Sequence, residues 1–250
     1  MMKSITERNK KVLQVIGEHG YVTYKEIQNI TGTKRQAFRV IDSMMNSNKF
    51  IESFDTGLIP SRGYYLTKKG GDTLSVFGTL RVCSLFKPCD FGPSEFYHNL
   101  SIIHVRLALE KHPYFLDFET PRVLLAKRGE LPELKPDAEV IFKEDHTPET
   151  LTIRTGLEIE LRPKWHERNI KKMKKFDTSN FSYLNNIIWV CNDNITIDAL
   201  CRAIKAGRIF EPSKHRFLLL NDLLKNGVFT CKITDWQGKD CSLFTRKGRE

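Results

Sequence analysis

The chain has 250 residues and a mass of 29.0 kDa, more than one average domain of about 100–150 residues, so two unequal domains are expected. Its 40% hydrophobic and 28% charged residues, with a mean hydropathy of -0.38, exclude the disordered, collagen-like and membrane classes. Forty Lys and Arg against 30 Asp and Glu leave a net charge of +10, which favours a polyanionic partner such as nucleic acid. No apolar run approaches the ~20 residues of a spanning helix, and the first residues lack the apolar core of a secretory signal. We therefore expect a cytoplasmic protein with no membrane contact.

Residues 1–80 predict three short helices followed by a β-hairpin. Polar caps such as Thr23 and Thr33, and the turn at Gly32, set the limits of the helices. Two alternating runs then indicate two strands joined by a loop with glycine and proline. This order is typical of a winged helix-turn-helix domain. The expected elements are a helix closed by Gly17 and Gly20, a helix between Thr23 and Gly32, a helix from Lys34 to about Asn48, and strands at 50–54 and 63–70.

The third helix is the candidate reader of DNA. Phe38, Ile41 and Met45 are expected on its buried side. Basic residues at its beginning oppose the helix dipole, a placement that needs a reason. In a major groove Arg reads guanine and Gln reads adenine, while lysines at the hairpin tip would meet phosphates. The predicted DNA contacts of this domain are Lys34, Arg35, Gln36, Arg39, Lys68 and Lys69. A solvated charged face, or a domain that docks protein, is the alternative.

Residues 81–93 predict a connector, and residues 94–250 predict an α/β domain, so that the whole chain is α+β. The strand at 186–191 is apolar enough to be buried on both faces. The tail after Asn221 has no clear pattern. The expected elements are a helix at 94–111, strands at 114–126, 138–142 and 151–161, a helix at 164–176, a strand at 186–191, a helix at 197–205 and a strand at 216–220.

Paired carboxylates mark the third of these strands. Because strand side chains alternate, Glu158 and Glu160 share one face and the apolar residues beside them share the other. If the preceding strand pairs with this one as a hairpin, Asp137 arrives beside them. Clustered carboxylates repel unless a cation neutralises them, and Mg²⁺ or Mn²⁺ suits an all-oxygen site. An ordinary polar strand face turned to solvent is the alternative.

The helix that follows is strongly basic. Several of its cations recur at helical spacing on one side, where like charges destabilise an isolated helix. A phosphate backbone along that side would remove the penalty, and a solvated face is the alternative. The candidate DNA contacts of this helix are Arg168, Lys171, Lys172, Lys174 and Lys175.

The second part resembles the PD-(D/E)xK nuclease-like superfamily in its helix–three-strand–helix–strand order and in Pro136-Asp137 followed by Glu158-Ile159-Glu160. The resemblance implies a restriction-endonuclease-like α/β fold and a divalent metal held by Asp137, Glu158 and Glu160. The third position is usually Lys in that superfamily, although some of its restriction endonucleases carry Glu there. Lys164 is the candidate for the displaced cation, which makes Asp137, Glu158, Glu160 and Lys164 the candidate catalytic residues.

The whole chain also resembles the replication-relaxation family of plasmid and mobile-element proteins. The segments that carry this resemblance are 64–70, 97–100, 135–138 and 157–161. It implies binding of double-stranded DNA connected with replication, mobilisation or its control, with the winged helix selecting a site and the second domain engaging adjacent DNA.

Two functional hypotheses remain open. The first is a metal-dependent DNA endonuclease or nickase. The second is a transcriptional repressor or replication initiator whose nuclease fold serves only to bind DNA or to form a homodimer.

Overall fold

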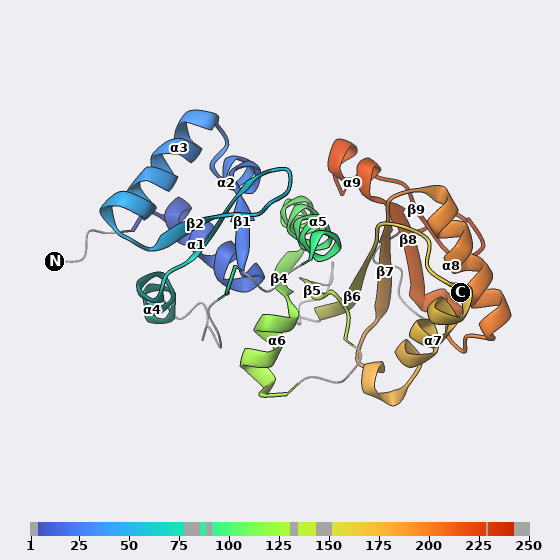
Figure 1. The fold of residues 1–250 in the computed structure, drawn as a ribbon. Helices are drawn as coiled ribbons and strands as arrows, with labels where there is room; N and C mark the ends of the chain where they lie inside the picture. Colours follow the sequence, from blue (N-terminus) through green and yellow to red (C-terminus); the bar gives the residue numbers. More distant parts are fainter. Residues whose placement is uncertain are drawn as a thin grey trace. The chain divides into compact units, whose positions relative to one another are not determined.

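The structure is a computed structural model that describes residues 5–77, 86–88, 92–130, 135–143, 152–228 and 230–242. The chain divides into two compact units (Figure 1). Unit 1 comprises Met1–Leu107 with Arg122–Glu130, and unit 2 comprises Ala108–Pro121 with Leu131–Glu250. These limits differ from the predicted connector at 81–93, of which residues 81–85 and 89–91 lie outside the described part of the chain.

Unit 1 has the order of a winged helix-turn-helix. Its three strands form an antiparallel sheet in the order β1-β3-β2, so that the first strand joins the hairpin made by the other two. The elements are α1 (Glu7–His19), β1 (Tyr21–Thr23), α2 (Tyr24–Thr31), α3 (Lys34–Asp42), a π-helical turn η1 (Ser43–Ser47), β2 (Ile51–Asp55), β3 (Arg62–Leu66) and α4 (Lys68–Val76).

Polar caps set the helix limits of unit 1, as the sequence indicates. The Thr23 side chain accepts a backbone N–H of α2, and Glu26 accepts the N–H of Thr23 in return, which completes a capping box. Thr33 caps α3 by accepting the N–H of Gln36 at 3.2 Å. Local hydrogen bonds at the start of α2 and at the start of α3 therefore fix where each helix of the helix-turn-helix begins.

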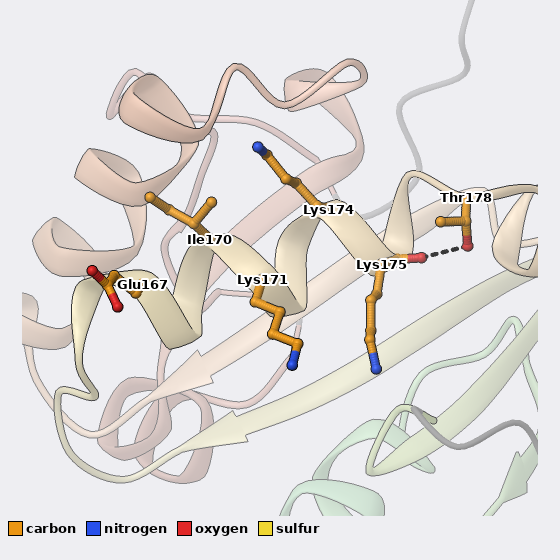
Figure 2. A pocket seen from close by; sticks show the side chains of 6 residues that line it. All are labelled: Glu167, Ile170, Lys171, Lys174, Lys175 and Thr178. Carbon is orange, nitrogen blue, oxygen red and sulfur yellow. Dashed lines mark hydrogen bonds between the residues drawn. The ribbon is translucent and has the colours of Figure 1, made fainter.

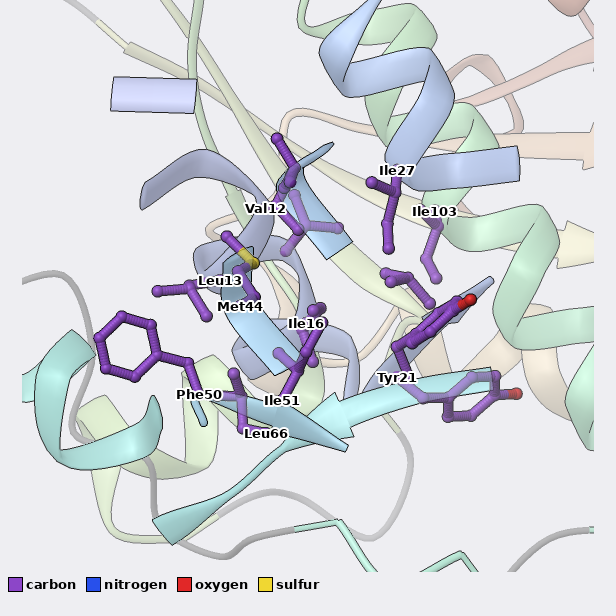
Figure 3. Close-up of a cluster of buried hydrophobic side chains, with 14 of the residues drawn as sticks. Val12, Leu13, Ile16, Tyr21, Ile27, Met44, Phe50, Ile51, Leu66 and Ile103 are labelled. Carbon is purple, nitrogen blue, oxygen red and sulfur yellow. The ribbon is translucent and has the colours of Figure 1, made fainter. Parts of the chain in front are cut away.

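The buried side of α3 differs from the prediction by one residue. Ala37, Val40 and Met44 face the core, whereas Phe38 is 70% exposed. The buried set (37, 40 and 44) and the predicted set (38, 41 and 45) have the same helical spacing. The small side chain of Ala37 packs against the core, and the larger Phe38 points to solvent. Figure 3 shows Met44 among the buried side chains of this core.

Helix α5 (Pro93–Leu109) begins in unit 1. Its side chains Phe96, Leu100 and Ile103 belong to the same buried cluster as the winged helix, and the Tyr21 and Phe96 rings stack at 5.6 Å. This packing explains why the compact unit extends beyond the predicted limit at residue 80.

Unit 2 is built on a mixed six-stranded sheet. Strands β4, β5 and β6 form an antiparallel meander, β6, β7 and β8 are parallel, and β9 is antiparallel at the edge. The strands are β4 (Phe115–Glu119), β5 (Ala138–Lys143), β6 (Thr152–Glu160), β7 (Asn186–Cys191), β8 (His215–Leu219) and β9 (Ile233–Thr234). The helices and helical turns are α7 (His166–Phe176), η2 (Ser179–Phe181), α8 (Asn194–Gly207), η3 (Pro212–Lys214) and α9 (Leu220–Asn226).

This order confirms the predicted fold class, with one local correction. The predicted strand at 114–126 ends at Glu119, and α6 (Pro121–Arg128) follows it. Pro121 is the first residue of this helix, where its fixed φ and missing N–H are tolerated. The unplaced tail supplies α9 and β9, and residues 243–250 lie outside the described part.

Helices α7 and α8 pack on one face of the parallel strands. Met173 and Phe176 of α7 and Leu200 of α8 share a buried cluster with Trp189 of β7. Every residue of β7 is buried, as the sequence predicts. Across the described ranges, no helix is both long and apolar enough to cross a membrane.

Candidate phosphate-binding and carboxylate site

The carboxylate site lies on β6, beneath α7. Glu158 and Glu160 are 0% and 1% exposed, so the alternative of a solvated strand face is wrong. Glu158 lies opposite Trp189 of β7 in the parallel register, and both belong to the sheet face that α7 covers. The sequence places two carboxylates where an ordinary sheet would have apolar residues.

The β5–β6 hairpin brings Asp137 to the same place, as expected. Ala138 pairs with Leu157, and the N–H of Asp137 donates to the Leu157 carbonyl at 2.9 Å. The Asp137 carboxylate in turn accepts the N–H of Ile159 at 2.7 Å. These bonds extend the ladder by one residue and fix Asp137 beside Glu158.

Lys172 of α7 reaches into this site. Its ammonium donates to Glu158 and lies 3.4 Å from Glu160 Oε1. It also lies 5.5 Å from the centroid of the Trp189 ring. Lys172 was predicted only as a DNA contact, and the structure gives it a buried role as the cation of the carboxylate site.

Lys164 provides a second cation. Its Nζ is 2.7 Å from Glu160 Oε1 and 2.6 Å from Oε2. Both oxygens of Glu160 are therefore engaged by an ammonium group, and the predicted catalytic role of Lys164 stays a prediction. Two lysines, one from the loop after β6 and one from α7, therefore lie beside Glu160.

Burial and charge act against each other on these groups. Complete burial raises the pKa of Glu158 well above its usual range, although Lys172 opposes the shift. Burial alone would lower the pKa of Lys172, but Glu158, Asp137 and Glu160 raise it. Lys172 therefore stays charged at neutral pH, and its charge compensates the carboxylates.

The predicted three-carboxylate metal site is not formed. Over the ranges that the structure describes, no group of three or more His, Cys, Asp and Glu is arranged to hold a metal ion. Glu160 is bound by lysines, which is the physical reason. Glu158 Oε1, however, is buried without a hydrogen-bond partner, and an unpaired buried oxygen of this kind fits a cation ligand. Mg²⁺ needs only one or two carboxylates when phosphates complete its shell, so Asp137 and Glu158 fit that ion.

A basic pocket of about 480 Å³ opens beside Asp137. Prolines form part of its wall, and cationic side chains form most of the rest. The lining residues are Pro121, Lys135, Pro136, Asp137, Arg168, Lys171, Lys172 and Lys175. We call this the basic pocket; five cations in it surround a single carboxylate.

Lys171, Lys174 and Lys175 of α7 line a second, open pocket, but Lys174 does not line the basic pocket. Figure 2 shows Lys171 and Lys175 extending to one side of the helix and Lys174 extending to the other. Arg168, Lys171, Lys172 and Lys175 line the basic pocket together, as the helical spacing predicts, whereas Lys174 does not line it.

In unit 1, the predicted DNA contacts of α3 are accessible. Lys34, Arg35 and Arg39 are exposed and Gln36 is half-buried. The hairpin tip was predicted wrongly, because Thr67 accepts the N–H of Gly70 and starts α4 at Lys68.

Lys68 and Lys69 are exposed at the start of α4 and not on the wing. The loop between β2 and β3 carries an apolar tip at Ile59, which is 83% exposed, and Arg62 begins β3 next to it. Arg62 is a basic residue of the wing that sequence reasoning missed.

A second ion-pair network lies further along the carboxylate face of the sheet. Arg154 donates to Glu119 and, at 2.7 Å, to Glu139, which also accepts the Tyr183 hydroxyl at 2.6 Å. In the sequence, the alternation of charged and apolar residues in β5 and β6 indicates which sheet face carries these charges. It does not indicate which residues pair with one another.

Comparison with known proteins gives little beyond a weak structural resemblance. No protein-family model matches the chain, and no curated protein matches it. The structure of restriction endonuclease FokI aligns with a TM-score of 0.31 and 10% identity, over 90% of this chain and 45% of that chain. The structure of FokI bound to DNA aligns with a TM-score of 0.30 and 12% identity, over 89% and 45%. This chain therefore spans less than half the length of the endonuclease that it weakly resembles.

Proposed function

We propose that this chain is a nuclease-like protein that binds double-stranded DNA. In this proposal α3 of unit 1 reads a site, and the basic pocket of unit 2 holds backbone phosphates of adjacent DNA. The observation that carries the proposal is the basic pocket, in which five cations surround Asp137. Phosphate contacts of this kind position a protein on a duplex without reading its sequence.

The arrangement of charge supports a polyanionic partner. Lys171 and Lys175 stand four residues apart on α7 and line the same pocket, so their repulsion costs the free protein a few tenths of a kcal/mol. Lys172 is already neutralised by Glu158 and Glu160. Arg168, Lys171 and Lys175 line the basic pocket from α7, and we assign these side chains to phosphates.

Lysine acetylation of the full chain, read by mass spectrometry with and without a duplex, tests this proposal. The duplex should protect Lys135, Lys171 and Lys175 from the reagent. Lys174 serves as an internal control, because it lies on the same helix but outside the basic pocket. Equal protection of all four lysines, or no protection of any, would refute a specific phosphate site in the pocket.

A second candidate function is metal-dependent cleavage of DNA at the same site. The observation that favours it is the buried, unpartnered Glu158 Oε1 beside Asp137. A magnesium ion held by Asp137 and Glu158 would polarise a phosphodiester and activate a water. Lys172 would keep positive charge next to the scissile group, and Lys164 would keep Glu160 away from the ion.

Nicking of supercoiled DNA decides between cleavage and binding alone. The wild-type chain should nick in Mg²⁺ or Mn²⁺ but not in EDTA, and Asp137→Asn should abolish nicking while duplex binding persists. If the wild type binds duplex DNA but never nicks it, the chain is a repressor or initiator with an inactive nuclease fold. A role in plasmid or mobile-element replication or mobilisation is proposed only from the resemblance of the sequence segments.

A further inference from the structure

The exposed face of α3 contains an aromatic ring among its basic residues. Arg35, Phe38, Arg39 and Asp42 follow helical spacing on one side, opposite the buried Ala37. Phe38 is 70% exposed, which leaves a large apolar surface in water on the helix that we assign to a major groove. Single exposed apolar residues are common, so the place of the ring and its orientation carry the inference.

The ring of Phe38 has a defined neighbour. The Tyr24 ring of α2 lies edge-on to it, with centroids 6.2 Å apart and an interplanar angle of 65°. The Tyr24 hydroxyl donates to the Lys34 carbonyl at 3.2 Å, which ties that ring to the start of α3. One edge of Phe38 is thus supported from α2, and the rest is exposed on the same side of α3 as Arg35 and Arg39.

We propose that Phe38 contacts the 5-methyl group of a thymine and so determines part of the sequence preference of unit 1. This inference rests on the proposed DNA binding by α3. Of the four bases, only thymine presents a methyl group in the major groove, and apolar side chains recognise that group by contact. Arg35 and Arg39 supply hydrogen-bond donors for guanine. Phe38 supplies an apolar surface, against which a thymine methyl group is removed from water.

The test begins with selection of bound sequences from a randomised duplex library by the full chain. Each thymine of an enriched site is then replaced singly by uracil, which removes the methyl group and keeps base pairing. At one or two positions the replacement should weaken wild-type binding about fourfold, the effect of one buried methyl-sized group. Phe38→Ala should bind the thymine and uracil duplexes equally, whereas Phe38→Leu should keep part of the preference.

The matched control is Phe210→Ala, because Phe210 is 86% exposed and belongs to unit 2. This variant should discriminate thymine from uracil as the wild type does. If the wild type tolerates uracil at every position, or Phe38→Ala still discriminates, the inference is overturned while DNA reading by α3 stands. If no sequence is enriched at all, DNA reading by unit 1 fails and the inference fails with it.

Discussion

Replacing Lys172 by Met removes the cation that lies between Glu158 and Glu160. The Lys172 side chain is 18% exposed and Glu158 is 0% exposed, so the variant leaves a buried carboxylate with no ammonium to neutralise it. Breaking one side of a buried ion pair costs about 3–5 kcal/mol in general. Glu160 keeps Lys164 and is expected to add little to this loss.

Protonation of Glu158 sets an upper limit on the cost. At about 1.36 kcal/mol for each pH unit above the ordinary pKa of 4.5, taking up a proton costs about 3.4 kcal/mol at pH 7 and about 0.7 kcal/mol at pH 5. Removing Lys172 raises the folded-state pKa of the Glu158 carboxyl further. At pH 7 the folded variant therefore holds a proton on Glu158, whereas the unfolded chain does not. The stability defect should therefore be largest at pH 7 and shrink as the pH falls towards 5.

Urea unfolding followed by tryptophan fluorescence measures this effect, since Trp165, Trp189 and Trp236 all belong to unit 2. Lys172→Met should lose about 3 kcal/mol at pH 7 and less than 1 kcal/mol at pH 5. Adding Glu158→Gln should restore most of the loss at pH 7 and remove its pH dependence. Lys171→Met, an exposed neighbour on the same helix, should change stability by less than about 0.5 kcal/mol. A defect that is equal at both pH values would refute the buried charge pair.

Three further predictions concern packing and charge elsewhere. Arg154→Met should destabilise unit 2 by about 3–5 kcal/mol in urea unfolding, because it leaves buried Glu119 and Glu139 without their shared cation, and a loss below 1 kcal/mol would contradict the network. Burial, with Lys214 and Arg216 nearby, lowers the pKa of His215 to about 3, so its neutral form stabilises the fold above pH 6.5 and this contribution falls by about 2 kcal/mol between pH 8 and pH 5. His215→Asn, which keeps an acceptor for Trp189, should lose that part of the pH dependence; an unchanged pH profile would mean that His215 titrates normally. Gly70→Ala should destabilise unit 1 by about 1–3 kcal/mol in thermal unfolding, although alanine normally favours a helix, because its Cβ would lie 2.1 Å from the Phe50 carbonyl oxygen; a stabilised variant would contradict this packing.

Much of the architecture was predictable because local rules and long-range packing agree. Thr23 and Thr33 cap the helices that their positions indicate, and strand alternation places Asp137 and Glu158 on one side of the β5–β6 hairpin. The errors arose where one pattern fits two structures. The sets 37/40/44 and 38/41/45 have the same spacing, and only the space available beside α3 selects the first.

The charge partners were not predictable from sequence. A lysine in a basic helix is usually solvated, so nothing in the sequence marks Lys172 as the residue that reaches Glu158 from α7. Its role depends on how α7 packs over β6. The start of α4 could have been predicted, because Thr67 is a residue type that caps helices. The alternating pattern of the residues before Thr67 led instead to a predicted strand that continues to residue 70.

The salt dependence of duplex binding tests the central claim most directly. Anisotropy titrations of the full chain with a labelled duplex should give a straight line of log affinity against log salt. Lys171→Gln with Lys175→Gln should lower the magnitude of its slope by about 1.8, at 0.9 for each lost phosphate contact, while Lys174→Gln leaves it unchanged. A slope that is the same for the double variant and the wild type, or a wild type that binds no duplex, would contradict the assignment of the basic pocket to DNA phosphates.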